Sequence, residues 1–304
     1  AADMTEEYLS RVVADGAPSL KTLATYREGL ACFKAWCDGR DPATFARKDI
    51  EDYRHALVGR YSRSTVALRL SVCKLFYRAL VRSGLRQDNP AEGVKAPRFA
   101  THPADRILSK ALSQDEAKRL LSDLPAPDDR RTARGRAVIV LMLCQGLRAC
   151  EVAGLSERDM DSVGLAWVRV HGKGAKDRVL FLGRPEQQAL GDYLNLKGPG
   201  IGPDAPMFVS EGGGDAHLTV RTIEGIVDAA LARSGLKQPG RSAHCLRHTY
   251  AVLATLGGAR QEALQMAMGH SSSKTTNHYA LAAARWQQNP ALCVGQALAL
   301  VGRA

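Results

Sequence analysis

Apolar residues recur every three or four positions along most of this chain, which is the spacing of a helix with one buried face. The pattern runs through residues 20–36 and 64–85, and it returns at residues 136–155, 218–236, 242–258, 260–269 and 271–286. One segment differs, because residues 165–171 alternate between two faces and KGAKD then turns the chain into RVLFLG. The chain therefore predicts a mostly α fold with one small antiparallel sheet.

Prolines mark a division of the chain. The stretch DNPAEGVKAPRFATHPAD carries prolines at positions 90, 97 and 103. Proline lacks a backbone donor and disfavours helix at the residue before it, so this stretch predicts an extended linker over residues 97–112. A helix begins directly afterwards, because Ser113 and Glu116 form an S-x-x-E capping box. We expect a helical domain over residues 1–96 and a mixed α/β domain over residues 113–304.

The charge of the chain favours a polyanionic partner. Its formal net charge is +11 and its pI is about 9.5, which favours nucleic acid over a membrane surface. Between Tyr53 and Gln87 there are eight Arg or Lys residues and no Asp or Glu. Solvated helix faces usually mix both signs, so this window predicts DNA contact, with a merely solvated face as the alternative. The predicted contact residues are Arg60, Arg63, Arg69, Lys74, Arg78 and Arg82.

Cysteine content and hydropathy indicate a reduced compartment. The seven cysteines are odd in number and include no CxxC pair, which predicts free thiols in a cytosolic protein. The sequence contains no run of 18 apolar residues, so it predicts no membrane span. The start AADMTEEYLS is too polar and acidic for a signal peptide. We expect a cytoplasmic protein without membrane contact.

The sequence HCLRHTY places His244, Arg247 and His248 on one face of a helix. Three interpretations are open from spacing alone. HxxxH spacing can hold zinc, although Cys245 stands where zinc proteases carry glutamate and Arg247 adds a cation. The three residues could instead be core groups satisfied by ion pairs. A third interpretation is an anion site, because an arginine fork and a histidine donor both suit phosphate oxygens.

Three other segments carry polar residues in unexpected places. In GLRACEVAGL, Arg148 follows Gly146 inside an apolar run and needs an anionic partner, which Glu151 could supply. In MGHSSS, His270 lies at a corner between two helices, and in NHYA, Tyr279 lies on the next helix. Spacing alone does not bring these side chains together.

The motifs taken together resemble the signature of the tyrosine recombinases, also called the lambda-integrase family, and most closely its Xer-type members. GLRACEVAGL, HGKGAKDRVLFL, SAHCLRHTYAVLATL and MAMGHSSSKTTNHY give an arginine box, a lysine hairpin, H-x-x-R-H, G-H and a tyrosine in the family's order. The resemblance covers residues 100–285 by motif, and the preceding 95 residues match the family's helical core-binding domain only in pattern. It implies a two-domain DNA clamp, with a helical core-binding domain and a mixed α/β catalytic domain.

The resemblance also implies a role for each motif residue. Tyr279 would be the nucleophile that attacks a DNA phosphodiester, becomes joined to the 3′-phosphate and releases a 5′-hydroxyl. Arg148 and Arg247 would hold the scissile phosphate, and His244 and His270 would assist through hydrogen bonds and proton transfer. A phenol has an ordinary pKa near 10, so we expect neighbouring cations to lower the pKa of Tyr279.

The lysines of the hairpin turn and two further residues complete the expected site. Lys173 would protonate the leaving 5′ oxygen, and Lys176 would contact a neighbouring phosphate. Glu151 and His248 would be support residues. Fixed arginine and histidine donors can stabilise the charge of the transition state, and no nucleotide-binding motif is present. We therefore expect neither a metal nor a nucleotide cofactor.

The implied function is DNA recombination by a bacterial or mobile-element site-specific recombinase that works through a Holliday junction, as in integration or excision. Its partners would be double-stranded DNA recombination sites, and four copies would assemble on two sites. The apolar tail at residues 289–304 could dock on a neighbouring protomer or on its own domain. A paralogue or accessory protein could take part, and the bound protein would be nucleoid-associated. The alternatives are a type IB topoisomerase-like nicking and closing enzyme and a catalytically silent DNA-binding relative.

Overall fold

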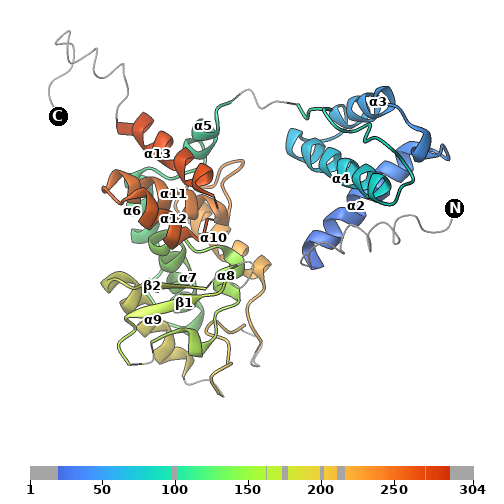
Figure 1. The fold of residues 1–304 in the computed structure, drawn as a ribbon. Helices are drawn as coiled ribbons and strands as arrows, with labels where there is room; N and C mark the ends of the chain where they lie inside the picture. The colour runs from blue at the N-terminus through green and yellow to red at the C-terminus, as the bar shows by residue number, and fades with distance from the viewer. Residues whose placement is uncertain are drawn as a thin grey trace, which may run out of the picture. The chain divides into compact units, whose positions relative to one another are not determined.

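The computed structural model describes residues 20–97, 101–161, 163–172, 177–198, 202–210, 216–270 and 272–287. The chain divides into two compact units, Ala1–Ala100 and Thr101–Ala304 (Figure 1). Within the described residues the elements are helices, apart from two paired strands in the second unit. This confirms the predicted fold class, a mostly α chain with a small antiparallel sheet.

The first unit is a helical domain built around aromatic side chains. Its elements are α2 (Leu20–Cys37), η1 (Pro42–Thr44), α3 (Arg47–Val58) and α4 (Arg63–Arg82). The Phe33 ring lies 4.9 Å from the Tyr53 ring, 5.7 Å from Phe76 and 6.0 Å from Tyr77, measured between centroids. These rings come from α2, α3 and α4, so a single aromatic cluster joins the three helices.

The second unit is organised around one buried helix. Helix α7 (Arg130–Gln145) packs against α9 (Arg184–Lys197), α10 (Val220–Arg233) and α11 (Ala243–Leu256), and its residues 137–143 are buried. A helix that is apolar on every side suits such a central position. The other described helices of this unit include α6 (Gln114–Ser122), α8 (Ala149–Ala153), η2 (Glu157–Asp159), α12 (Gln261–Met268) and α13 (Ser273–Gln287).

The predicted hairpin forms at one side of this unit. Strands β1 (Trp167–Val170) and β2 (Arg178–Phe181) are antiparallel, with Val170 opposite Arg178. Val168, Val170 and Leu180 face the core, whereas Phe181 is exposed, as expected of a sheet with one solvated face. The turn residues 173–176, which include Lys173 and Lys176, lie outside the described residues.

The predicted extended linker over residues 97–112 is wrong in its second half. Residues Pro103–Leu108 form helix α5, which packs against α13. His102 caps the helix, because its Nδ1 accepts a hydrogen bond of 3.2 Å from the Ala104 amide. Pro103 occupies the first helical position, where a missing N–H costs nothing. Pro103, which the sequence pattern predicts to exclude a helix, is therefore the first residue of one.

Two further sequence expectations concern the thiols and the membrane. The six described cysteines are free, and Cys293 lies outside the described residues. Among the helices that the structure describes, none has the length and apolar character that crossing a bilayer requires.

Candidate active site

A cleft of about 1160 Å³ opens on the second unit and gathers side chains from distant parts of the chain. Its walls come from α5, the α7–α8 turn, the hairpin, α11, α12 and α13. Spacing alone did not bring the motif residues together, but the fold does. The predicted site residues that line the cleft are Arg148, Glu151, His244, Arg247, His248, His270 and Tyr279.

The turn at Gly146 sets the position of the arginine box. Helix α7 ends there with a left-handed residue, at a φ of 65°. A Cβ at this position would lie 2.3 Å from Cδ1 of Tyr250, so glycine is required both by conformation and by space. Arg148 then stands at the N-cap of α8 and reaches the cleft. Tyr250 packs under the turn, which leaves Tyr279 as the tyrosine of the cleft.

Glu151 is the acidic centre of the site. Its side chain is buried, and Oε1 accepts a hydrogen bond of 2.8 Å from Arg148 Nη1, as the sequence predicts. Arg178 donates to both carboxylate oxygens, and Arg247 Nη1 lies 3.9 Å from Oε2. Burial opposes ionisation, yet the Arg178 and Arg148 hydrogen bonds and charges hold the pKa of Glu151 below its ordinary value. One carboxylate thus faces three guanidinium groups.

Arg247 is the most buried of these cations. Only 1% of its side chain is exposed, and it donates a hydrogen bond of 2.6 Å to the Gly146 carbonyl and another to the Met268 carbonyl. Burial and the charge of Arg148 lower its pKa to about 10, so the guanidinium remains charged at neutral pH. These carbonyls fix the guanidinium in the cleft wall while it keeps further N–H donors.

Tyr279 lies between two histidines. The residue is only 3% exposed, and its hydroxyl shares a hydrogen bond of 2.9 Å with His248 Nδ1. The His270 ring is stacked on the Tyr279 ring, with centroids 6.0 Å apart and an angle of 7° between the planes. His270 Nδ1 is held in turn by the Thr276 hydroxyl at 3.1 Å. His248, predicted only as a support residue, is the group in direct contact with the phenol.

The protonation states differ from the sequence expectation. Burial raises the pKa of Tyr279, and the opposing charges of Arg247 and Arg148 do not reverse the shift. The two arginines do lower this pKa, as expected, but in the protein alone burial has the larger effect and the net shift is upward. Burial, with nearby cations, also lowers the pKa of His248 to about 3 and that of His270 to about 4. Both imidazoles are neutral at pH 7 and able to accept a proton.

The sequence did not predict several polar residues that line the cleft, among them Lys110, His171 and Arg178. The carboxylates of Asp159, 2.8 Å from Nε2 of His171, and of Asp177, 3.0 Å from Nδ1, accept hydrogen bonds from the protonated ring, and these contacts raise the pKa of His171. His171 and Arg178 flank the lysine turn in the sequence, so their closeness to Lys173 along the chain could have identified them as residues of the site. Lys110 follows a helix that the sequence did not predict.

The basic residues of the first unit are mostly on its surface. Arg60, Arg63, Arg78 and Arg82 are exposed, and Lys74 is half-buried. Arg69 is a correction to the predicted set, because its side chain is only 10% exposed and forms an ion pair with Glu28. Its guanidinium carbon also lies 3.6 Å from the centroid of the Tyr61 ring. Arg69 is used within the unit and does not belong to a DNA-facing surface.

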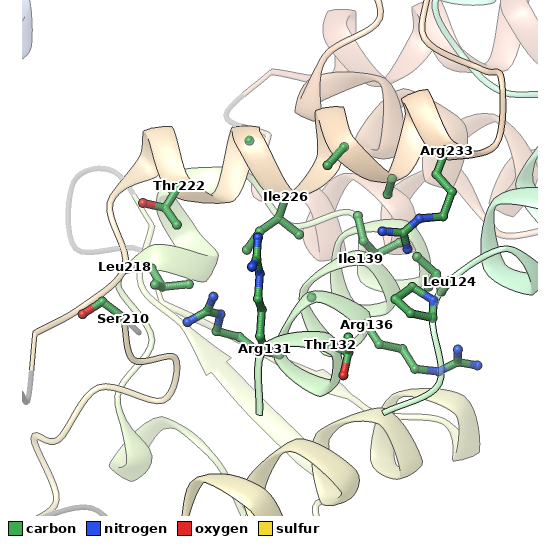
Figure 2. Close-up of a pocket in the computed structure, with 16 residues that line it drawn as sticks. Leu124, Arg131, Thr132, Arg136, Ile139, Ser210, Leu218, Thr222, Ile226 and Arg233 are labelled. Atoms are coloured by element: carbon green, nitrogen blue, oxygen red, sulfur yellow. The ribbon is translucent and has the colours of Figure 1, made fainter. Parts of the chain in front are cut away.

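A second cleft, of about 500 Å³, lies between α7 and α10 (Figure 2). Its floor is apolar, with Ile139 and Ile226 facing each other, and Arg131, Arg136 and Arg233 stand around it. It shares no lining residue with the first cleft and holds none of the predicted catalytic residues. The chemistry of the motifs therefore belongs to the first cleft.

The zinc interpretation of HxxxH finds no support in the described part of the chain. There, no three or more His, Cys, Asp or Glu side chains lie together in a way that could hold a metal ion. The rings of His244 and His248 meet edge to face, with centroids 4.6 Å apart, and Arg247 lines the same cleft. The set of donors suits an anion.

Comparison with known proteins agrees with this arrangement. The sequence matches the phage integrase family over residues 110–285 and the phage integrase N-terminal SAM-like domain over residues 5–84. The chain belongs to the phage integrase family. Tyrosine recombinase XerC of Pelobacter propionicus is 33% identical over 85% of this chain and 83% of its own length. Tyrosine recombinase XerD of Xanthomonas axonopodis pv. citri is 31% identical over 93% of both chains.

Solved structures of the family share the fold. A lambda integrase dimer bound to a COC′ core site has a TM-score of 0.72 and 16% identity, over 90% of this chain and 93% of that one. A XerH site-specific recombinase bound to a palindromic difH substrate has a TM-score of 0.72 and 19% identity, over 92% of this chain and 79% of that one. The family resemblance predicted from the motifs is confirmed, and the chain is a tyrosine recombinase enzyme.

Proposed function

We propose that this protein cleaves and rejoins DNA at specific sites through a covalent bond between Tyr279 and a 3′-phosphate. The hydrogen bond of 2.9 Å between the Tyr279 hydroxyl and His248 carries the proposal, because it pairs a nucleophile with a neutral base. Arg148 and Arg247 line the same cleft and supply fixed charge for a phosphate.

The first step is attack by the Tyr279 oxygen on phosphorus. The new bond joins the tyrosine to the phosphate, and the bond from phosphorus to the 5′ oxygen breaks. The phenol proton passes to His248, whose pKa rises when the negative phosphate enters the cleft. Arg148 and Arg247 stabilise the charge that develops on the non-bridging oxygens, where one such donor is typically worth about 10²- to 10³-fold in rate.

The remaining steps complete the proton and bond balance. His244 and His270 donate hydrogen bonds to the bound phosphate, and Lys173 gives its proton to the leaving 5′ oxygen, with Lys176 on a neighbouring phosphate. The 5′-hydroxyl of a second strand then gives its proton to Lys173 and attacks the phosphotyrosine. A phosphodiester re-forms, the bond from phosphorus to the tyrosine oxygen breaks, and Tyr279 takes its proton back from His248. The phosphotyrosine retains the energy of the broken bond, so the cycle requires no nucleotide.

The basic surface of the first unit is the proposed second part of the DNA-binding site. It consists of Arg60, Arg63, Lys74, Arg78 and Arg82, without Arg69. Four copies on two DNA sites would allow strands to be exchanged between duplexes through a Holliday junction. The tail at residues 289–304, which lies outside the described residues, would support this assembly.

The test is to trap the covalent intermediate on DNA that flanks the gene and to map the joined nucleotides by sequencing. Tyr279→Phe should abolish the SDS-resistant adduct and leave DNA binding nearly unchanged, because only the nucleophilic oxygen is removed. Tyr250→Phe is the matched control and should retain the adduct. An adduct that persists in Tyr279→Phe would refute the assignment. Exchange between two differently marked duplexes separates recombination from nicking and closing of one duplex.

A further inference from the structure

Arg178 is a buried cation at the junction of three elements that carry proposed catalytic groups. It is the first residue of β2 and follows the turn that holds Lys173. Its Nη1 and Nη2 donate to Oε1 and Oε2 of Glu151 at 3.1 and 2.9 Å, so the two groups form a parallel fork. Its Nε donates to the Ala267 carbonyl, in the last turn of α12, at 2.7 Å.

The packing around this fork is close. The side chain of Arg178 is 10% exposed and that of Glu151 is 5% exposed. A Cβ on Gly269 would lie 3.1 Å from Nη1 of Arg178, and Gly269 has a left-handed φ of 60°. The corner that leads from α12 to His270 therefore closes directly over the guanidinium. A lysine could keep the charge but not the planar fork.

The fork also decides which groups Glu151 can hold. Glu151 bonds Arg148 at 2.8 Å, whereas Arg247 Nη1 lies 3.9 Å away. With both oxygens occupied by Arg178, the carboxylate holds Arg148 at the edge of the cleft. If the fork were broken, Glu151 would be free to move toward Arg247 and to draw that guanidinium away from a phosphate.

We propose that Arg178 is a positioning residue, which fixes the arginine box, the lysine hairpin and the α12–α13 corner in one catalytic arrangement by binding both oxygens of Glu151. It touches no reacting atom in this role. The inference rests on the proposed strand-cleaving function of the cleft.

The chain offers a matched control for the removal of such a fork. Arg241 forms the same kind of buried pair with Glu116, with Nη1–Oε1 at 2.9 Å and Nη2–Oε2 at 3.0 Å, and its side chain is 8% exposed. Neither residue lines the active-site cleft. Arg241→Lys therefore reports what the removal of a buried fork does to stability in the same unit.

The experiment measures single-turnover formation of the covalent adduct, DNA affinity and thermal stability in the full chain. Arg178→Lys should cleave about 10²-fold more slowly than the unmutated protein, because small misplacements of catalytic groups have effects of that size. Its DNA affinity should be nearly unchanged. Arg241→Lys should show a comparable decrease in thermal stability and keep a near-normal cleavage rate.

Two further measurements separate positioning from general damage. Combining Arg178→Lys with Glu151→Gln should slow cleavage no more than the slower single variant, because both act through one contact. Arg178→Gln should lose activity on acidification at a higher pH than the unmutated protein, since Glu151 protonates more readily without Arg178. Should Arg178→Gln fail to fold, the lysine variant and the double variant still decide the question.

The outcomes distinguish the two proposals. If the unmutated protein forms no covalent adduct, the proposed function fails, whatever the variants do. If it forms the adduct and Arg178→Lys cleaves at the unmutated rate, only the positioning role is refuted. An equal decrease of rate in Arg241→Lys would also overturn it, because the effect would then reflect general destabilisation.

Discussion

The burial of His248, the residue that contacts Tyr279, makes the unbound site sensitive to acid. The pKa of His248 is lowered from 6.5 to about 3, first by burial and then by its cationic and histidine neighbours. Between these two values the unfolded chain binds a proton that the folded protein does not. The free energy of unfolding therefore rises with pH across this window, and the His248 contribution disappears as the pH falls toward 3.

Replacing His248 should flatten this dependence. We expect the free energy of unfolding of His248→Gln, measured by urea denaturation, to fall less between pH 7 and pH 5 than that of the unmutated protein, because glutamine does not titrate. His217, exposed and bound through Nδ1 to the Ala153 carbonyl, provides a control with His217→Gln. Equal pH dependence in the unmutated protein and His248→Gln would show that His248 is not neutral in the fold.

Gly146 should tolerate no side chain. Gly146→Ala places a Cβ 2.3 Å from Tyr250 Cδ1 in a left-handed residue, so we expect it to lower the free energy of unfolding by more than the roughly 1–2 kcal/mol of the conformation alone. Gly225 in α10 is the control, because a Cβ there meets nothing within 4 Å. Gly225→Ala should stabilise by about 0.5–1 kcal/mol. A neutral Gly146→Ala would contradict the geometry of the turn.

For single residues, the sequence predicts contacts between residues that are near each other in the chain better than contacts between residues that are far apart in it. Glu151 was named as a partner of Arg148 because the two are three residues apart, and the pair forms. Arg178 reaches the same carboxylate from 27 residues away, and only the fold brings the two together. The motif resemblance implies a catalytic role for His244 and only a support role for His248, yet it is His248 that contacts the phenol.

At the scale of elements, helix α4 shows how one basic window serves two purposes. Lys74, Arg78 and Arg82 are four residues apart and share one face, away from the core residues Val66, Leu70 and Cys73. Arg69 lies on the core side and is buried. The spacing of the apolar residues separates the core side of α4 from its exposed face, whereas the number of basic residues in the window does not.

Helix α4 therefore predicts different effects for the two groups of cations. DNA affinity should fall as the salt concentration rises, and a plot of log affinity against log salt concentration should have a slope of about −0.9 per neutralised phosphate. Replacing Lys74, Arg78 and Arg82 together by neutral residues should make that slope shallower by about 0.9 for each phosphate left without its cation. Arg69→Met should instead lower the stability of the first unit and leave the slope unchanged. An unchanged slope in the triple variant would make this face of α4 a solvated surface only.

Helices α3 and α5 show the limits of reading elements from sequence. In α3 the buried residues Ile50, Tyr53 and Leu57 keep helical spacing, but the polar residues between them weaken the apolar stripe. In α5 the six residues are too few to show a period, and Pro103 suggested an extended chain. The long helices α2 and α4 were predictable because their stripes extend over several turns.

At the scale of the whole molecule, the two units have separate hydrophobic cores. Phe33, Tyr53 and Tyr77 belong to a buried cluster of the first unit, and Ile139 and Leu141 belong to one of the second. The clusters share no residue. Each unit thus carries its own source of hydrophobic stabilisation, and a chain of this kind need not unfold in one step.

We therefore expect calorimetry of the full chain to resolve two unfolding transitions. Phe33→Ala should lower the midpoint of one transition and Leu141→Ala that of the other, because truncating a buried Phe or Leu costs about 2–5 kcal/mol within its own core. Gly225→Ala should raise the same transition that Leu141→Ala lowers, which assigns it to the second unit. If either core substitution moved both transitions together, the units would be unfolding as one cooperative body.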